Sequence, residues 1–304
     1  HLVRVLAREG YRIRVAVRRP ELAQHLQPLG SVGQVHAVQA NINDKASVQH
    51  AVIGADHVIN LTGILFQSGK QSFRNIHHNG ARTVAEAARL EGAKSFVHVS
   101  AIGASLKSGS RYAKTKALGE KAVLEEFPAA VILRPSVIFG PEDQFFNKFA
   151  EMALYSPALP LIGGGKTKLQ PVYVGDVAMA ILHAMSGRAD KGKIYELGGP
   201  QIMTLKEVMR KTLEFSDRKR LLLWVPSVVA KWLMAPFLSV LPKPPLTMDQ
   251  VTQLGYHNTV SQEAEEEGRT LESLGVNSNN TVDAIVPEYL ERFRPHGQFS
   301  GLRL

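Results

Sequence analysis

The sequence of 304 residues contains no cysteine and no uninterrupted run of eighteen apolar residues. The first absence excludes disulfides, thiolate metal sites and cysteine nucleophiles, although it does not identify the compartment. The second leaves no candidate for a membrane-spanning helix, and no signal peptide is visible, so the sequence predicts a soluble or peripheral protein. The residues that are present, 44% hydrophobic and 21% charged, are typical of a globular chain with a sizeable core.

Positive charge is the most unusual feature of the composition. The 36 lysines and arginines against 27 aspartates and glutamates give a formal net charge of +9. This balance suits an anionic partner, whether a phosphate-bearing cofactor, nucleic acid, an acidic lipid or an acidic protein surface. Helix-turn-helix, zinc-finger and aromatic-basic stacking motifs are absent, so we expect neither nucleic acid nor metal as a partner. A nucleotide-sensing or nucleic-acid-associated role is therefore the least favoured function.

Short strand-like runs alternate with helical segments from the start of the chain to Gly140. The helical segments cover residues 2–9, 44–54, 75–92 and 111–127. The strand-like runs cover residues 11–17, 34–42, 56–64, 95–101 and 129–140. Strands separated by single helices cannot form hairpins, so they are expected to lie parallel with helices on both faces. The pattern predicts an α/β fold with a doubly wound parallel sheet of the Rossmann type.

The first element of the sequence is a helix, whereas a sheet of this kind normally starts with a strand and a glycine-rich turn. We therefore expect the chain to be truncated at its amino terminus and to lack the first strand and the glycine loop. After Gly140 the alternation loosens. This change predicts a dinucleotide-binding domain of residues 1–140 and 171–198 and a smaller C-terminal α/β lobe of residues 141–170 and 199–304.

The most apolar region is the stretch 221–241, in which Pro226, Lys231 and Pro236 interrupt any spanning helix. One helical face carries its large side chains: Val228, Val229, Trp232, Leu233 and Phe237. Such a face can cover the protein's own core, dock on a partner or make a peripheral contact with a membrane. Covering the core is slightly favoured, with partner docking close behind.

A candidate catalytic group consists of Ser100, Tyr112 and Lys116. Ser100 ends a strand, and Tyr112 and Lys116 are one helical turn apart, so the phenol and the ammonium are expected to face the same strand end. That edge of an open parallel sheet is where ligands bind. A nearby ammonium is expected to lower the pKa of the tyrosine, Ser100 to orient a substrate oxygen, and a nicotinamide to supply hydride.

This combination resembles the extended and atypical short-chain dehydrogenase/reductase families, which are NAD-dependent epimerase/dehydratase-like, and in which serine, tyrosine and lysine form the catalytic triad. Arg18 and Arg19 follow the first strand-like run, where an acidic residue would favour NAD and arginine can receive the phosphate of NADP. The cofactor expected from the resemblance is therefore NADP(H) rather than NAD(H).

The resemblance also implies further cofactor-binding positions. The expected set, which again includes Tyr112 and Lys116, is completed by Asn41, Ile42, Leu61, Thr62, Gly63, Pro135 and Ser136. Asn41 stands where the family usually has aspartate, so it keeps a hydrogen-bonding side chain without the charge. His77 stands where the family often has an asparagine, and we interpret it as an ordinary polar helix residue rather than a proton relay.

The segments 60–73, 163–178 and 286–299 closely resemble the bacterial and mitochondrial family that includes the NADPH-binding accessory subunit of respiratory complex I. This resemblance implies a bacterial accessory or assembly component with complex I subunits as partners. It would lie on the cytoplasmic side of the bacterial inner membrane, or on the matrix side in a mitochondrion. The alternative is an active NADP-dependent reductase or sugar-nucleotide epimerase/dehydratase that uses Ser100, Tyr112 and Lys116, since the same residues can hold a cofactor with or without turnover.

Overall fold

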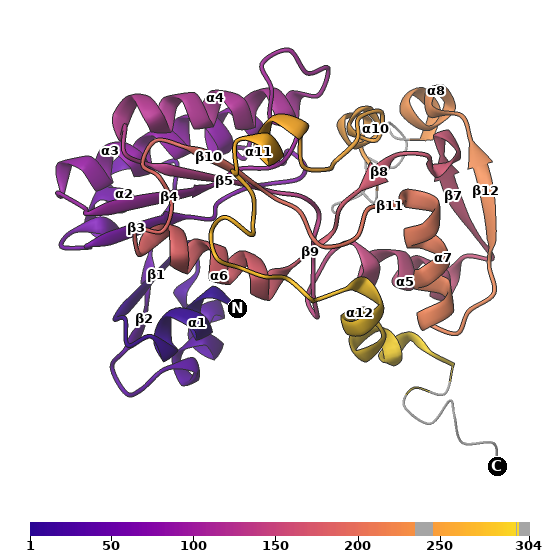
Figure 1. The fold of residues 1–304 in the computed structure, drawn as a ribbon, viewed down its shortest axis with the longest axis horizontal. Helices are drawn as coiled ribbons and strands as arrows, with labels where there is room; N and C mark the ends of the chain where they lie inside the picture. The colour runs from indigo at the N-terminus through magenta and orange to yellow at the C-terminus, as the bar shows by residue number, and fades with distance from the viewer. Residues whose placement is uncertain (235–245, 296, 298–304) are drawn as a thin grey trace.

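The computed structural model describes residues 1–234, 246–295 and 297. Figure 1 shows a helix-flanked sheet on the left and a smaller lobe on the right. The strands are β1 (Ile13–Val17), β2 (Val35–Gln39), β3 (His57–Asn60), β4 (Ser95–Val99), β5 (Val131–Pro135), β6 (Ile138–Phe139), β7 (Ala158–Ile162), β8 (Lys168–Leu169), β9 (Val172–Tyr173), β10 (Ile194–Leu197), β11 (Met203–Thr204) and β12 (Leu221–Val225).

Helices separate most of these strands along the chain. The α-helices are α1 (Leu2–Arg8), α2 (Lys45–Val52), α3 (Ala81–Leu90), α4 (Arg111–Glu126), α5 (Phe146–Tyr155), α6 (Val174–Met185), α7 (Leu205–Phe215), α8 (Ser227–Val229), α10 (Met248–Gln253), α11 (Gln262–Glu266) and α12 (Val282–Leu290). The 3₁₀ and π segments are η1 (Pro20–Leu29), η2 (Arg74–Gly80), η3 (Gly163–Gly165), η4 (Ala230–Met234) and η5 (Glu291–Phe293).

The main sheet has four parallel strands in the order β10-β5-β4-β3, and β1 and β2 form a separate parallel pair. No strand of the described residues pairs with both β1 and β3 to join the two sheets. The parallel strands confirm the α/β fold that the alternation of strand-like and helical segments predicts.

Both faces of the main sheet are covered, because its strands are apolar on both sides. In β4, Phe96 packs with Val123 and Phe127 on the side of α2, α3 and α4, while Val97 packs with Leu133 and residues of α1 and α6 on the other side. Figure 1 shows α2, α3 and α4 above the sheet and α1 and α6 below it. A strand buried on both faces carries apolar residues at consecutive positions, as Phe96 and Val97 do here.

The smaller lobe is built around a second core that contains Phe139, Phe146, Val208 and Val286. It also contains a parallel two-stranded sheet, in which β12 lies beside β7. The pair β6–β9 lies within the predicted dinucleotide-binding domain, and the pair β8–β11 lies within the predicted smaller lobe. The exact division at residues 140, 170 and 198 stays a prediction.

The expectation that 221–241 covers the protein's own core is wrong for the described part of its apolar helical face. Val228, Val229, Trp232 and Leu233 have exposed fractions of 69%, 40%, 66% and 71%, whereas Ala230 is buried. Pro236 and Phe237, in the same predicted stretch, lie outside the described residues. Among the described residues, no helix has the length and apolar character needed to cross a bilayer.

Candidate functional site

The structure places Ser100 and Lys116 together at the carboxyl end of β4. Ser100 directly follows this strand, and its backbone N–H donates to the Leu133 carbonyl at 2.7 Å. Lys116 reaches from α4 and donates from Nζ to the carbonyl of Val99 at 2.9 Å. Lys116 is 4% exposed. Burial lowers the pKa of Lys116 to about 8, with the charge of Glu120 acting in the opposite direction.

Two buried polar atoms at this strand end have no hydrogen-bond partner within the described residues: Ser100 Oγ and His98 Nε2. Side chains two apart on a strand point to the same face, so both belong to the side of β4 that faces Lys116. Leaving such a group unpaired costs about 1–3 kcal/mol. A polar ligand at this edge would remove that cost, so the residues present fit the nicotinamide end of a dinucleotide or a carbonyl substrate.

Tyr112 lies near the first turn of α4 in an aromatic cluster. Its ring is edge-on to His77 at 5.2 Å and to Phe73 at 5.9 Å between ring centroids, and Phe73 stacks on His77 at 5.3 Å. These contacts fix the plane of the phenol. The cluster shows how residues of η2 and α4, which are far apart in sequence, together orient one predicted catalytic side chain.

The expectation that Lys116 lowers the pKa of Tyr112 is wrong in this structure. Burial, and next the negative charge of Asp249, raise the pKa of Tyr112 to about 12. The ammonium of Lys116 is directed to the Val99 carbonyl instead. Tyr112 is therefore a neutral hydrogen-bond donor at pH 7.

His77 is a buried core residue with a 1% exposed side chain, not an ordinary polar helix residue. Its Nε2 accepts from the N–H of Ile64 at 3.1 Å, so its proton lies on Nδ1, which donates to Thr115 Oγ1 at 3.1 Å. Burial, and next the charge of Lys116, lower the pKa of His77 to about 3. His77 is thus a fixed neutral side chain beside the phenol of Tyr112.

The loop after β3 is held by a second buried histidine. Asn60 Nδ2 donates to His98 Nδ1 at 3.3 Å, and Asn60 Oδ1 accepts from the N–H of Thr62 at 3.0 Å. Thr62 and its neighbour Leu61 are exposed. A Cβ placed on Gly63 would lie 3.9 Å from both His77 Nε2 and Lys116 Nζ. The predicted cofactor loop 61–63 therefore borders the same edge as the triad.

Two residues of the smaller lobe reach this edge, and no sequence pattern singles out either of them. Asp249, on α10, accepts from Ser110 Oγ, Arg111 N and Tyr112 N at 2.8, 2.6 and 3.1 Å, so its carboxylate caps the start of α4. A carboxylate is stabilised at this end of a helix by the helix dipole. Because Asp249 lies more than 130 residues from the start of α4 in the sequence, no local pattern could have linked them.

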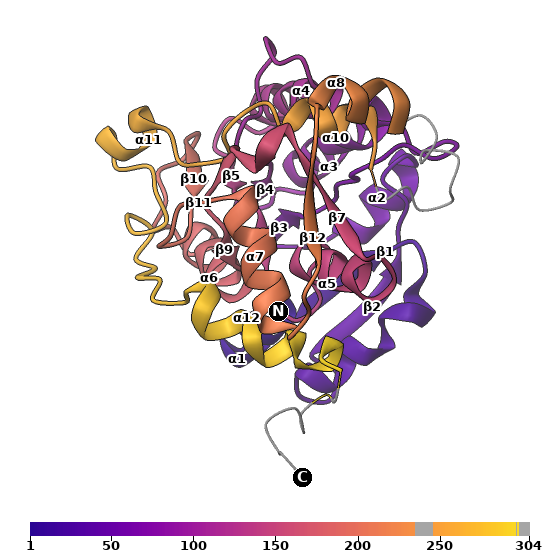
Figure 2. The same ribbon diagram turned by 90° about the vertical axis from the view of Figure 1, so that its right-hand side faces the viewer.

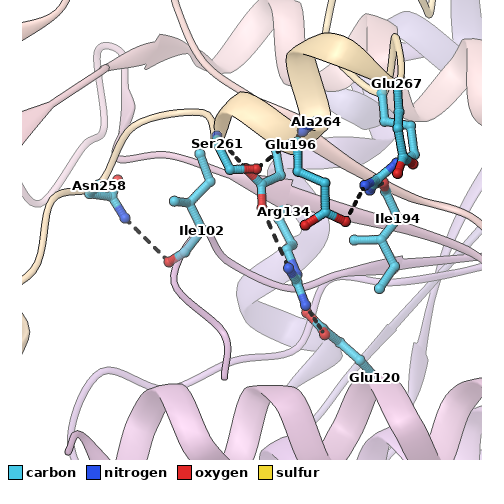
Figure 3. Close-up of polar contacts among 11 residues, drawn as sticks. Ile102, Glu120, Arg134, Ile194, Glu196, Asn258, Ser261, Ala264 and Glu267 are labelled. Atoms are coloured by element: carbon cyan, nitrogen blue, oxygen red, sulfur yellow. Dashed lines mark hydrogen bonds and ion pairs between the residues drawn. The ribbon is translucent and has the colours of Figure 1, made fainter. Parts of the chain in front are cut away.

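Asn258 is the second of these residues. Its Nδ2 donates to the carbonyl of Ile102 at 3.3 Å, as Figure 3 shows, and its Oδ1 accepts from Ser136 Oγ at 2.6 Å. Pro135, directly before Ser136, accepts from the N–H of Ile102 at 3.0 Å. The hydroxyl of Ser136 is therefore already bound within the chain. The cofactor roles of Pro135 and Ser136 stay predictions.

Three of the predicted cofactor residues line one hollow of about 540 Å³: Arg18, Asn41 and Ile42. Lys45 and Lys70 also line it, and no carboxylate does. Lys45 forms an ion pair with Glu86 at 2.6 Å, whereas Arg18 is exposed. Positive charge without a facing carboxylate fits a phosphate group. Arg19, the other predicted arginine, is not among the residues that line the hollow.

A buried ion network lies one helical turn beyond Lys116. Arg134, on β5, donates from Nε and Nη2 to the two carboxylate oxygens of Glu120 at 2.8 and 2.7 Å, and from Nη1 to Glu196 at 3.4 Å. Glu196 also accepts from the N–H of Ser261 at 2.8 Å. Figure 3 shows Arg134 between the two carboxylates. The network joins α4, β5 and β10 to the segment that precedes α11.

Comparisons with known proteins agree with this architecture. Residues 1–198 match the NAD dependent epimerase/dehydratase family. A crystal structure of a dTDP-glucose 4,6-dehydratase from Streptomyces venezuelae with NAD bound covers 96% of this chain and 92% of its own, with a TM-score of 0.71 and 19% identity. The chain belongs to the NAD dependent epimerase/dehydratase family, as the motifs around Ser100, Tyr112 and Lys116 predict.

Two curated relatives represent different roles within this family. NADH dehydrogenase [ubiquinone] 1 alpha subcomplex subunit 9 of Arabidopsis thaliana is 35% identical over 275 residues, which cover 87% of this chain and 68% of that protein. A ceramide reductase of Caulobacter vibrioides is 34% identical over 182 residues, 60% of this chain and 56% of the reductase. The match to subunit 9 confirms the predicted resemblance to the complex I subunit family.

Proposed function

We propose that the chain is an NADP(H)-binding accessory or assembly protein of respiratory complex I. The observation that carries this proposal is the 35% identity to subunit 9 over 87% of the chain. In a bacterium the protein would lie on the cytoplasmic surface of the inner membrane, and in a mitochondrion on the matrix side. The bound dinucleotide would be a structural element whose presence fixes the edge of the sheet around Ser100 and Lys116.

NADP(H) rather than NAD(H) is supported by the charge of the hollow around Arg18, which offers cations and no facing carboxylate. A dianionic phosphate gains from such a site, whereas the ribose hydroxyls of NAD would gain more from a carboxylate. We expect Arg18→Ala to weaken NADPH binding by about 10- to 100-fold, which corresponds to a charge-assisted hydrogen bond, and to leave NADH binding within about twofold. Isothermal titration calorimetry measures both.

Arg19→Ala is the matched control, since Arg19 is also exposed but does not line the hollow. It is expected to change NADPH affinity by less than about threefold. If the wild-type chain bound NADH as tightly as NADPH, or if Arg19→Ala had the larger effect, the assignment of NADP(H) through Arg18 would be wrong.

A second candidate function is an NADP-dependent reductase or epimerase, and the unpartnered Ser100 Oγ favours it. The nicotinamide, when bound, supplies hydride chemistry. Ser100 would hold a substrate oxygen by hydrogen bonding. Tyr112 would give a proton to that oxygen, since its pKa of about 12 keeps it protonated at pH 7. Lys116 would hold the sugar hydroxyls of the dinucleotide.

Affinity purification of the full-length chain from membranes in mild detergent distinguishes the two functions. We expect complex I subunits to be recovered with it. We also expect about one NADPH per chain, which is not oxidised when candidate carbonyl substrates are added, because a structural cofactor must stay bound. Mass spectrometry identifies the subunits, and absorbance at 340 nm follows the nucleotide.

The control is Tyr112→Phe, which removes the phenolic proton and keeps the ring contacts with His77 and Phe73. A structural protein is expected to retain subunits and nucleotide in this variant. Steady oxidation of NADPH that Tyr112→Phe abolishes, without recovery of complex I subunits, would instead establish the second candidate.

A further inference from the structure

Several large apolar side chains of β12 and of the helical segment α8–η4 are exposed. We define this surface as the β12–α8 patch, formed by Leu221, Leu223, Val228, Val229, Trp232 and Leu233. Their exposed fractions run from 40% to 71%. Figure 2 shows β12 at the front of that view with α8 above it, and Figure 1 shows both at the outer edge of the smaller lobe.

The fold turns these side chains outward for a clear reason. In β12, Leu222 packs with Leu159 and Leu213 in the inner core, so the alternate residues Leu221 and Leu223 point to the opposite, outer face. On the adjoining helical segment, Ala230 faces inward. The helical segment therefore packs inward through this small residue, and the side chains of Val228, Val229, Trp232 and Leu233 remain exposed. An exposed surface of this kind usually marks an interaction site.

Charge identifies the occupant of the patch. From Arg218 to Met248 the sequence contains five lysines and arginines and no aspartate or glutamate. Lys219 is exposed beside Leu221, and Lys231 Nζ lies 5.8 Å from the ring centroid of Trp232. The nearest carboxylate along the chain is Asp217, in the turn before β12. Cations that border an apolar face complement the phosphates that border the hydrocarbon of a membrane.

Tryptophan supports the same occupant. Of the two tryptophans of the chain, Trp232 belongs to the patch and is 66% exposed, whereas Trp224 is on the face of β12 opposite to Leu221 and Leu223. Tryptophan is enriched where proteins meet the headgroup layer, because its ring is apolar and its N–H is polar. A second copy of this chain would bring two basic patches together, which the net charge of +9 disfavours.

We propose that the β12–α8 patch docks on the surface of a bilayer containing anionic phospholipid, with Trp232 and Leu233 entering the headgroup layer and Lys219 and Lys231 facing lipid phosphates. This docking is independent of the function proposed above. It would hold the smaller lobe against the membrane.

Tryptophan fluorescence of the full-length chain tests the docking, since one of its two tryptophans, Trp232, belongs to the patch. Vesicles of phosphatidylcholine with 30% phosphatidylglycerol are expected to shift the emission to shorter wavelength, and vesicles of phosphatidylcholine alone to do so at least about tenfold more weakly. No respiratory subunit is present in either vesicle, so the result does not depend on the association with complex I. An unchanged spectrum with the anionic vesicles overturns the proposal.

Variants locate the contact by co-sedimentation with the same anionic vesicles. Trp232→Ser with Leu233→Ser is expected to weaken binding at least about tenfold, and Lys219→Gln and Lys231→Gln about fivefold each. The matched controls are Leu22→Ser, at a 65% exposed leucine of η1, and Lys191→Gln, at an exposed lysine before β10. Both controls are expected to bind as the wild-type chain does.

Three other outcomes contradict membrane docking. Vesicle binding that Trp232→Ser with Leu233→Ser leaves unchanged would place the contact elsewhere. Concentration-dependent dimers without lipid, lost in that double variant, would identify a second copy as the occupant. Recovery of a protein partner without vesicle binding would identify a protein surface. The two lysine variants keep the proposal testable if the double variant does not fold.

Discussion

We expect the free energy of unfolding to fall by about 4 kcal/mol between pH 7 and pH 5 because of two buried histidines, His77 and His98. Burial, and next the charge of Lys116, lower the pKa of each to about 3. Both side chains are 1% exposed. Each is therefore neutral in the folded protein across this range, whereas an unfolded histidine has a pKa of about 6.5.

The direction of the effect follows from the protons that each state binds. Below pH 6.5 the unfolded chain takes up protons at both positions and the folded chain does not, so acid favours unfolding. The stability is fully present above about pH 6.5 and is lost progressively as the pH falls toward 3. Each histidine contributes about 2 kcal/mol of the loss between pH 7 and pH 5. His57, whose pKa burial also lowers, adds in the same direction.

Denaturant unfolding at pH 7, 6 and 5 measures this loss. His98→Gln is expected to reduce the loss by about 2 kcal/mol, since only one of the two titrations remains. His50→Gln, at an exposed histidine of α2, is the matched control and is expected to keep the full pH dependence. The comparison uses the difference between pH values, so a lower stability of His98→Gln at pH 7 does not affect it. A loss below about 1 kcal/mol in the wild-type chain would show that these histidines titrate normally.

The convergence of Ser100 and Lys116 could be predicted because it depends on local rules. A residue that ends a parallel strand lies at the ligand edge, and helical spacing directs Lys116 to the same place. The raised pKa of Tyr112 depends instead on burial, and next on the charge of Asp249, which belongs to the smaller lobe. Periodicity says nothing about charges brought together by tertiary packing, so the sign of this pKa shift could not be read from the sequence.

The stretch around Trp232 shows a related limit. Helical spacing correctly predicts that its large apolar side chains share a face, but spacing does not say whether that face is turned toward a core or toward solvent. In the structure Ala230 is buried, so the face with the large side chains is turned toward solvent. His77 is the opposite case. A polar residue in a helix is usually expected to be exposed, whereas two hydrogen bonds and stacking on Phe73 stabilise the His77 side chain in the core.

Arg134→Met is expected to lower the free energy of unfolding by about 3–5 kcal/mol at pH 7, the usual consequence of removing one partner from a buried ion pair. The substitution leaves the carboxylates of Glu120 and Glu196 without their shared cation. Their side chains are 5% and 9% exposed, so water screens them poorly. In the wild-type chain these carboxylates raise the pKa of Arg134, although its burial acts against the charge.

Arg82→Met is the matched control, because Arg82 pairs with Glu126 on the same helix α4 but is 54% exposed. It is expected to cost less than about 1 kcal/mol. Arg134→Met with Glu120→Gln is expected to recover part of the loss, because one unpaired carboxylate is removed. Denaturant unfolding at pH 7 measures all three. If Arg134→Met were no more destabilising than Arg82→Met, the bidentate pair would contribute no more than a surface pair, and α4 would be held on β5 by its apolar contacts alone.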